Sequence, residues 1–232
     1  MSRGFDANIY RNLVFACPFK EGSGTLAYDR AKSSLRHTMT LTGTPTWTAA
    51  GLGGRVQVLD FNSAHPDYLQ CSAAGSTDLD FTSGNFSICA WLYANSLVTE
   101  PRIVARGNIH ADGYEFLIFA NGSIVLVTYQ AGTHQYTISS IGAITIGSWH
   151  FISTVRIGVS ARVYLAGVDN TLTAATHINP LTSARKLHIG IHDDEINNAL
   201  NGLLYFPRIW SRALTPEEVY YLYQTERGLF GV

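Results

Sequence analysis

Apolar side chains alternate with other residues at a period of two through most of this chain, which is typical of β-strands. The clearest case is segment 85–94, Asn-Phe-Ser-Ile-Cys-Ala-Trp-Leu-Tyr-Ala. One face carries Phe86, Ile88, Ala90 and Leu92, and the other carries Ser87, Cys89, Trp91 and Tyr93. Because large side chains lie on both faces, we expect this strand to be covered on both sides and to be central in its sheet.

Two further β-rich runs, 113–120 and 123–130, are joined by Asn121-Gly122. Both turn residues tolerate positive φ, so we expect a hairpin with a type I′ turn. Other predicted strands are 13–17, 55–61, 68–71, 103–106, 135–139, 149–155, 162–165, 186–189 and 202–210. Many short strands separated by Gly and Asn turns predict an all-β fold, a two-sheet antiparallel β-sandwich of the jelly-roll type.

One short helix is predicted near the C-terminus. Thr215-Pro216-Glu217-Glu218 has the capping-box pattern, with Pro at the first helical position. Val219, Leu222 and Tyr223 then form one apolar stripe. We expect a helix from Pro216 to about Thr225, packed on the edge of the sandwich.

The 232 residues fit one domain, because β-sandwiches reach roughly 200 to 250 residues as single units. No linker or repeat divides the chain, so we predict a domain over 13–232 preceded by an N-terminal arm, 1–12. The 12 Tyr, 11 Phe and 4 Trp supply a large core, in which we place Trp91 and Trp149. Three cysteines, Cys17, Cys71 and Cys89, lie in predicted strands and are expected to be buried thiols rather than a disulfide framework.

Charge and hydropathy limit the classes of partner that the chain is expected to bind. The 16 Lys and Arg nearly balance the 17 Asp and Glu without a basic run, which disfavours nucleic acid. No run approaches the roughly 18 apolar residues of a membrane helix, so no membrane partner is predicted. The polar start, 1–12, has no apolar core of a signal peptide. We therefore expect synthesis in the cytosol, and association with a virion or release by lysis.

Five segments, in order, are similar to the motifs of one family. They are 13–31 (LVFACPFKEGSGTLAYDRA), 51–71 (GLGGRVQVLDFNSAHPDYLQC), 81–94 (FTSGNFSICAWLYA), 146–167 (IGSWHFISTVRIGVSARVYLAG) and 200–223 (LNGLLYFPRIWSRALTPEEVYYLY). The chain resembles the concanavalin A-like lectin/glucanase superfamily, and within it the laminin-G-like domains of bacterial and phage surface proteins. The resemblance implies a lectin-like sandwich that acts by recognition.

Two positions depart from that family pattern. Ala166-Gly167 replaces the usual Asn-Gly of a hairpin, and Tyr205 replaces an Asp that helps to hold a structural calcium in related domains. Loop carboxylates of the type that calcium selects are Asp29, Asp60, Asp67, Asp112 and Asp193. Turn chemistry explains these carboxylates equally well. Calcium is therefore possible, but neither a metal site nor a cofactor is predicted.

Catalysis is not indicated. Glycosidases of this fold need two carboxylates about 5 to 10 Å apart at the scissile bond, and no strand here carries alternating acidic residues. The nearest cluster, Asp193-Asp194-Glu195, is predicted to be a solvated acidic loop between strands. His188 and His192 are four residues apart, but in a strand context they would not converge on zinc.

Aromatic and polar residues near the predicted hairpin are the candidate ligand contacts. Glycan sites combine aromatic faces, which stack on sugars, with short polar groups that orient hydroxyls. The candidates are His110, Asp112, Tyr114, Tyr129, His134 and Tyr136. The alternative is that the tyrosines only fill the core and the sheet surface.

Three functions remain open. The leading hypothesis is a non-catalytic recognition or adhesion module that binds a glycan or a surface protein, exposed on a phage particle. The second is a virion structural protein, a capsid decoration or tail component, and the weakest is a glycoside hydrolase. Because Ile9 and Tyr10 of the arm and Leu229-Phe230 of the tail offer apolar anchors, we expect both ends to contact neighbouring chains.

Overall fold

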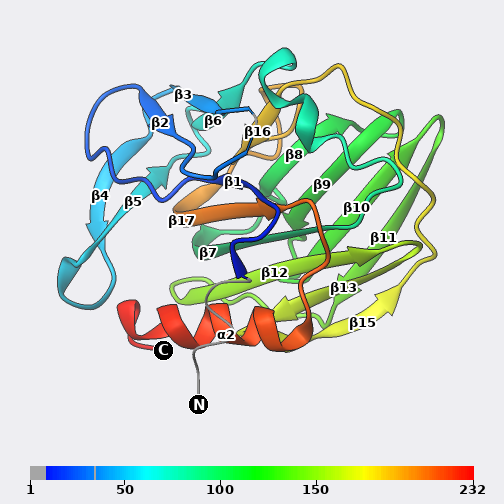
Figure 1. Cartoon of the computed structure of the whole chain (residues 1–232). Helices are drawn as coiled ribbons and strands as arrows, with labels where there is room; N and C mark the ends of the chain where they lie inside the picture. The colour runs from blue at the N-terminus through cyan, green and yellow to red at the C-terminus, as the bar shows by residue number, and fades with distance from the viewer. Residues whose placement is uncertain (1–8, 34) are drawn as a thin grey trace.

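The computed structural model describes residues 9–33 and 35–232, and these form two stacked antiparallel sheets (Figure 1). The eight-stranded sheet has the order β14-β13-β12-β7-β17-β5-β4, with β1 also paired to β17. The nine-stranded sheet has the order β15-β11-β10-β9-β8-β16-β6-β3-β2. The predicted β-sandwich is confirmed, and the segment of the predicted arm before Ile9 lies outside the described residues.

The eight-stranded sheet consists of β1 (Leu13–Ala16), β4 (Thr46–Ala50), β5 (Val56–Phe61), β7 (Phe86–Ser96), β12 (Trp149–Ile157), β13 (Ser160–Leu165), β14 (Val168–Asp169) and β17 (Asn201–Trp210). The nine-stranded sheet consists of β2 (Leu26–Tyr28), β3 (Thr38–Thr42), β6 (Tyr68–Cys71), β8 (Arg102–Asn108), β9 (Asp112–Ile118), β10 (Ile124–Gln130), β11 (Thr133–Ser139), β15 (Thr171–Ala174) and β16 (Leu187–Ile189). The helical segments are η1 (Leu52–Gly54), η2 (Ala74–Leu79), α2 (Pro216–Glu226) and η3 (Arg227–Leu229).

Strand β7 lies at the centre of the eight-stranded sheet and is covered on both faces, as its sequence predicts. Phe86, Ile88, Ala90 and Leu92 face the core between the sheets. On the opposite face, Trp91 is fully buried in a second cluster beneath α2, where its ring contacts Phe230 at 4.4 Å between centroids. Trp149 packs at the margin of this second cluster and is only half-buried, so its placement in the core is correct only in part.

The β9–β10 hairpin forms where expected, but its turn is of a different type. Gly122 N donates to Phe119 O, and Phe119 N donates to Ser123 O, both at 2.9 Å. Positive φ occurs at Gly122 (81°) and not at Asn121. The hairpin therefore has a longer loop with a glycine bulge, and the type I′ prediction is wrong. Both central residues have positive φ instead at Ala166 (50°) and Gly167 (78°), between β13 and β14.

Helix α2 begins and ends within one residue of the prediction. The Thr215 hydroxyl accepts from Glu218 N at 3.3 Å, and the Glu218 carboxylate accepts from Thr215 N at 2.9 Å. This capping box is the one that the sequence predicts. Helix α2 lies along the outer side of the eight-stranded sheet (Figure 1). Val219 and Leu222 of this helix belong to the cluster between it and the sheet. No helix among the described residues has the length and apolar character needed to cross a membrane.

The described parts of the chain ends pack against their own domain. Ile9 is 2% exposed, and its carbonyl accepts a hydrogen bond of 2.7 Å from Trp210 Nε1. Phe230 is 8% exposed against Trp91 and Trp149. Ile9 and Phe230 are therefore wrong as anchors for a neighbouring chain, because both fill the cluster beneath α2. Tyr10, in contrast, is largely exposed.

All three cysteines are free and buried, as predicted. Burial raises the pKa of the Cys89 thiol to about 12, so this group stays protonated and apolar at neutral pH.

Candidate functional site

One row of outward-facing residues crosses seven strands of the nine-stranded sheet. In register, the row runs Thr40, Gln70, His188, Ala105, Glu115, Val127 and Tyr136. The neighbours of Glu115 along β9, Tyr114 and Phe116, point the other way into the core between the sheets. The row thus marks the outer face of this sheet. Its centre carries the charged Glu115, one end carries Thr40 and the other end carries the aromatic Tyr136.

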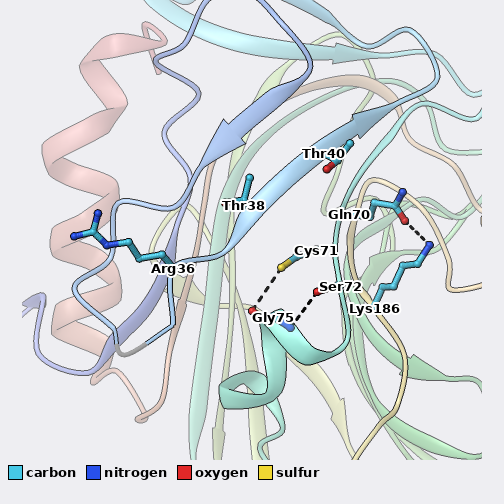
Figure 2. Close-up of a pocket in the computed structure, with 8 residues that line it drawn as sticks. All are labelled: Arg36, Thr38, Thr40, Gln70, Cys71, Ser72, Gly75 and Lys186. Carbon is cyan, nitrogen blue, oxygen red and sulfur yellow. Dashed lines mark hydrogen bonds between the residues drawn. The ribbon is translucent and has the colours of Figure 1, made fainter.

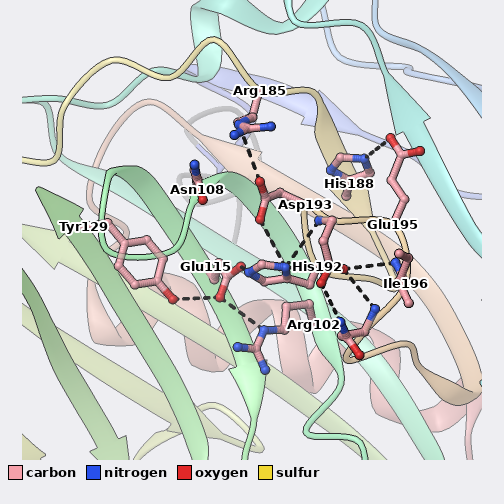
Figure 3. A network of polar contacts seen from close by, with 12 residues as sticks. Arg102, Asn108, Glu115, Tyr129, Arg185, His188, His192, Asp193, Glu195 and Ile196 are labelled. Atoms are coloured by element: carbon pink, nitrogen blue, oxygen red, sulfur yellow. Dashed lines mark hydrogen bonds and ion pairs between the residues drawn. The ribbon is translucent and has the colours of Figure 1, made fainter. Parts of the chain in front are cut away.

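The centre of the outer face is a buried charge network (Figure 3). Glu115 is completely buried, and Arg102 Nε and the Tyr129 hydroxyl donate to its Oε2 at 3.1 and 2.8 Å. His192 Nε2 lies 3.3 Å from Glu115 Oε1, an ion-pair distance without hydrogen-bond geometry. Because a buried carboxylate is costly without partners, these contacts fix Glu115 in place.

The acidic loop after β16 lies over this network. Asp193 stands 3.1 Å from His192 Nδ1 and 3.5 Å from Arg185 Nε, and its side chain is 5% exposed. Glu195 accepts from Lys186 at 2.7 Å, from His188 at 3.1 Å and from the Tyr68 hydroxyl at 2.9 Å. The segment is a loop, as predicted. Its description as solvated is wrong for Asp193, which is buried by its charged partners.

The loop carboxylates Asp194 and Glu195 have pKa values below the usual range. Burial alone would raise their pKa values, but hydrogen bonds outweigh it. Those from Lys186, His188 and Tyr68 lower the pKa of Glu195 to about 2. Those from Asn197 and the backbone lower the pKa of Asp194 to about 2. Both side chains are therefore ionised at neutral pH and hold no proton that they could donate to a leaving group.

A pocket of ≈ 440 Å³ opens at the β3 end of the row (Figure 2). Hydroxyl, amide and ammonium groups line the pocket, and they belong to Thr38, Thr40, Gln70, Ser72 and Lys186. Lys186 Nζ donates to Gln70 Oε1 at 2.6 Å, while Arg36 at the rim points away from the other side chains (Figure 2). Such groups can donate to and accept from sugar hydroxyls.

The sequence prediction missed this pocket because it missed β3. In Thr38–Thr42 the signal is weak, although Met39 is fully buried between the exposed Thr38 and Thr40. That alternation of threonine with apolar residues was the available evidence.

At the opposite end of the face the structure gathers five of the six predicted site residues. His110 and His134 approach to 2.8 Å between their Nδ1 atoms, and the rings of His134 and Tyr136 lie 4.8 Å apart. His110 also meets Tyr129 edge-on at 6.2 Å. Asp112 lies in the same hairpin and accepts from Asn108 N at 3.0 Å.

Tyr114 does not belong to this cluster. Its ring is completely buried between the sheets, 4.8 Å from Phe86, and its hydroxyl donates to Leu79 O at 3.1 Å. Tyr114 cannot touch a ligand, so its assignment to the site is wrong. Tyr129 is 1% exposed, so its ring offers no surface on which a sugar could stack. Its hydroxyl donates to Glu115, and it therefore helps to hold the buried charge network in place.

Two of the loop carboxylates of the type that calcium selects, Asp29 and Asp67, accept hydrogen bonds from backbone amides. Asp29 Oδ1 accepts from Ala16 N and Ala31 N at 2.8 and 2.7 Å. Asp67 accepts from Thr44 N and Asn62 N at 2.6 and 2.9 Å. Within residues 9–33 and 35–232, no three His, Cys, Asp or Glu side chains are grouped to hold a metal ion.

The family model described as the concanavalin A-like lectin/glucanases superfamily matches residues 67–220. No curated protein sequence matches the chain. Among solved structures, the binding domain of Paraclostridial Mosquitocidal Protein 1 superposes with a TM-score of 0.74 at 14% identity, covering 94% of this chain and 53% of that one.

Botulinum neurotoxin domains superpose similarly. Neurotoxin type C, whose cell entry depends on interaction with two ganglioside molecules, gives a TM-score of 0.65 at 14% identity over 94% of this chain and 52% of that one. The binding domain of neurotoxin DC in complex with rat synaptotagmin II gives 0.64 at 13% identity, with 94% and 52% covered. This chain therefore spans about half the length of these structures.

Proposed function

The chain belongs to the concanavalin A-like lectin/glucanase superfamily, and on that premise we propose that it is a non-catalytic recognition module that binds a glycan on the outer face of its nine-stranded sheet. The observation that carries the proposal is the pocket lined by Thr38, Thr40, Gln70, Ser72 and Lys186, whose donors and acceptors match sugar hydroxyls. The half-buried Tyr136 and exposed His134 at the far end of the face would contact a longer glycan.

Several contacts argue against glycoside hydrolysis on this face. An enzyme of this kind needs a protonated carboxylic acid beside a second carboxylate at the scissile bond. Glu115 is buried and contacted by Arg102, Tyr129 and His192, so it is not accessible to a substrate. Glu195 is ionised at neutral pH, because its pKa is lowered to about 2. The solved structures that match include the binding domain of Paraclostridial Mosquitocidal Protein 1, although the superfamily also includes glucanases.

A glycan array tests the proposal. Thr40→Arg places a long charged side chain in the pocket and is expected to lower the signal of bound glycans at least about tenfold, through loss of one to two hydrogen bonds. Thr46→Arg, at an exposed position of β4 in the other sheet, is the matched control and should leave the signal unchanged. Circular dichroism verifies that both variants fold.

The far end is tested separately. The double variant His134→Ala and Tyr136→Ala should weaken only glycans longer than the pocket. A blank array for the wild type, or equal loss in the two arginine variants, would refute the proposal. Release of reducing sugars from β-glucans should be absent; release that disappears in Glu195→Gln would instead support the hydrolase.

Exposure on a phage particle, the alternative role as a capsid decoration or tail component, and release by lysis stay predictions. The anchor role of the arm before Ile9 is part of the same expectation.

A further inference from the structure

A second pocket, of ≈ 610 Å³, lies on the other sheet, where β1 runs beside β17. Of the residues that the structure describes, three with aromatic rings and two with basic side chains line it, and none of these described lining residues is acidic. The described lining residues are Tyr10, Leu13, Ala16, Pro18, Lys20, Arg30, Tyr205 and Phe206. This composition differs from the hydroxyl-lined pocket of the nine-stranded sheet.

A strained bulge in β17 places Phe206 in this pocket. The register with β7 shifts between Tyr205 and Arg208, and Phe206 has a φ of 49° directly before Pro207. Left-handed backbone is unfavourable for an aromatic residue, and a following proline disfavours helical backbone as well. Such strain persists only where the surroundings enforce it, and it is concentrated at ligand and active sites.

Contacts around the bulge hold Phe206 in this strained conformation. Pro207 O accepts from Cys17 N at 3.0 Å, which ties the bulge to the chain after β1. The Arg208 guanidinium lies 4.2 Å from the centroid of the Phe206 ring. Two hydrogen bonds of 2.6 and 2.8 Å fix that guanidinium to Glu226 of α2. The half-buried Phe206 ring is thus held from beneath as a rigid platform.

The basic side chains of the pocket retain donors for a ligand. Arg30 is 57% exposed and gives one Nη2 hydrogen bond of 3.0 Å to Glu21, from a guanidinium with five N–H groups. Lys20 is exposed at the same pocket. Tyr10, 65% exposed, adds a second aromatic ring.

We propose that this pocket binds an acidic sugar residue, with its carboxylate on Arg30 and Lys20 and its ring on Phe206 and Tyr10. An acidic sugar combines an apolar C–H face, which stacks on aromatic rings, with a carboxylate, which pairs with a guanidinium. A neutral sugar would leave the two cations unused, and a bare inorganic anion would leave the rings unused. The site is independent of the outer face of the nine-stranded sheet.

Titration by NMR tests this with 3′-sialyllactose, trigalacturonate and, as the neutral counterpart, lactose. At least one acidic probe should bind, and lactose should not bind in this pocket. Arg30→Gln is expected to weaken the acidic probe at least about tenfold, the effect of losing a charge-assisted hydrogen bond. Tyr10→Ala should also weaken it. Arg55→Gln, which removes an exposed arginine outside the pocket, is the matched control and should bind as the wild type does.

The variant Thr40→Arg separates this site from the proposed glycan face and should leave binding of the acidic probe intact. Loss of that binding in Thr40→Arg would place the acidic sugar on the nine-stranded sheet and overturn this inference while sparing the proposed function. Equal affinity of wild type and Arg30→Gln, or no binding of either acidic probe at millimolar concentration, would also overturn it.

Discussion

His37 lies between two carboxylates, and this arrangement predicts how the stability of the domain changes with pH. Its Nδ1 stands 2.6 Å from Asp29 Oδ2, and its Nε2 stands 2.8 Å from Asp78 Oδ1. Both ring nitrogens face acceptors, so the protonated imidazolium is the favoured form. Burial alone would lower the pKa of His37, but the hydrogen bonds and charges of Asp29 and Asp78 raise it to about 9.

A histidine with a raised pKa stabilises the folded state while it is protonated. The contribution is fully present below the unfolded value of 6.5 and is lost as the pH rises through about 9. One pKa unit corresponds to about 1.4 kcal/mol, so a rise from 6.5 to about 9 is equivalent to at most about 3–4 kcal/mol. Because Asp78 is 18% exposed and partly screened, we expect about 2 kcal/mol.

The assay is urea denaturation of wild type and His37→Gln across this pH range. The difference in free energy of unfolding between the two proteins should shrink by about 2 kcal/mol between about pH 6 and pH 9.5. His177→Gln is the matched control: burial, followed by the charge of Arg156, lowers the pKa of His177 to about 4, so that residue stays neutral in the folded protein. Its replacement should change the pH profile only near pH 6, where the unfolded histidine still binds a proton, and in the opposite sense. Parallel pH profiles for wild type and His37→Gln would refute the reasoning.

Three further substitutions test the fold. Trp91→Ala should lower the free energy of unfolding by about 3–5 kcal/mol in urea, since the indole is fully buried beneath α2; a loss below about 2 kcal/mol would contradict that packing. Gly122→Ala should cost about 1–3 kcal/mol in the same assay, because φ is 81° and a Cβ would meet Ile144 O at 2.6 Å, whereas Gly132→Ala, with open space around it, should cost less. Thr215→Ala should cost about 1 kcal/mol through loss of the cap, and an unchanged melting temperature would argue against it.

The strands that the sequence predicts are those whose alternation is reinforced by large residues or turn signals. β7 and α2 are clear because each has both periodicity and defined ends. The short, threonine-rich β3 and the exposed β15 bury too little apolar surface to produce a pattern. The residue types of Asn121-Gly122 predict a two-residue turn, whereas the loop in the structure is one residue longer and has a different turn type.

The site was harder to predict because the strands around it are apolar on both faces. In β9, Tyr114 and Glu115 are adjacent and therefore point to opposite sides of the sheet. Register pairs Tyr114 with Thr128 rather than with Tyr129, so the two tyrosines lie on different faces. No sequence pattern distinguishes these faces when both are filled with apolar residues. The charge network of Glu115 joins residues from separate strands and a loop, which only the tertiary fold brings together.

Ile9 and Phe230 belong to one cluster beneath α2, although 220 positions separate them in the sequence. Because both residues lie on the outer face of the eight-stranded sheet, a host backbone can enter and leave the domain on the same side, which suits insertion as a cassette into a loop of a host protein. The same arrangement permits circular permutation, in which a linker runs along that face and an exposed loop such as Gly158-Val159 is opened.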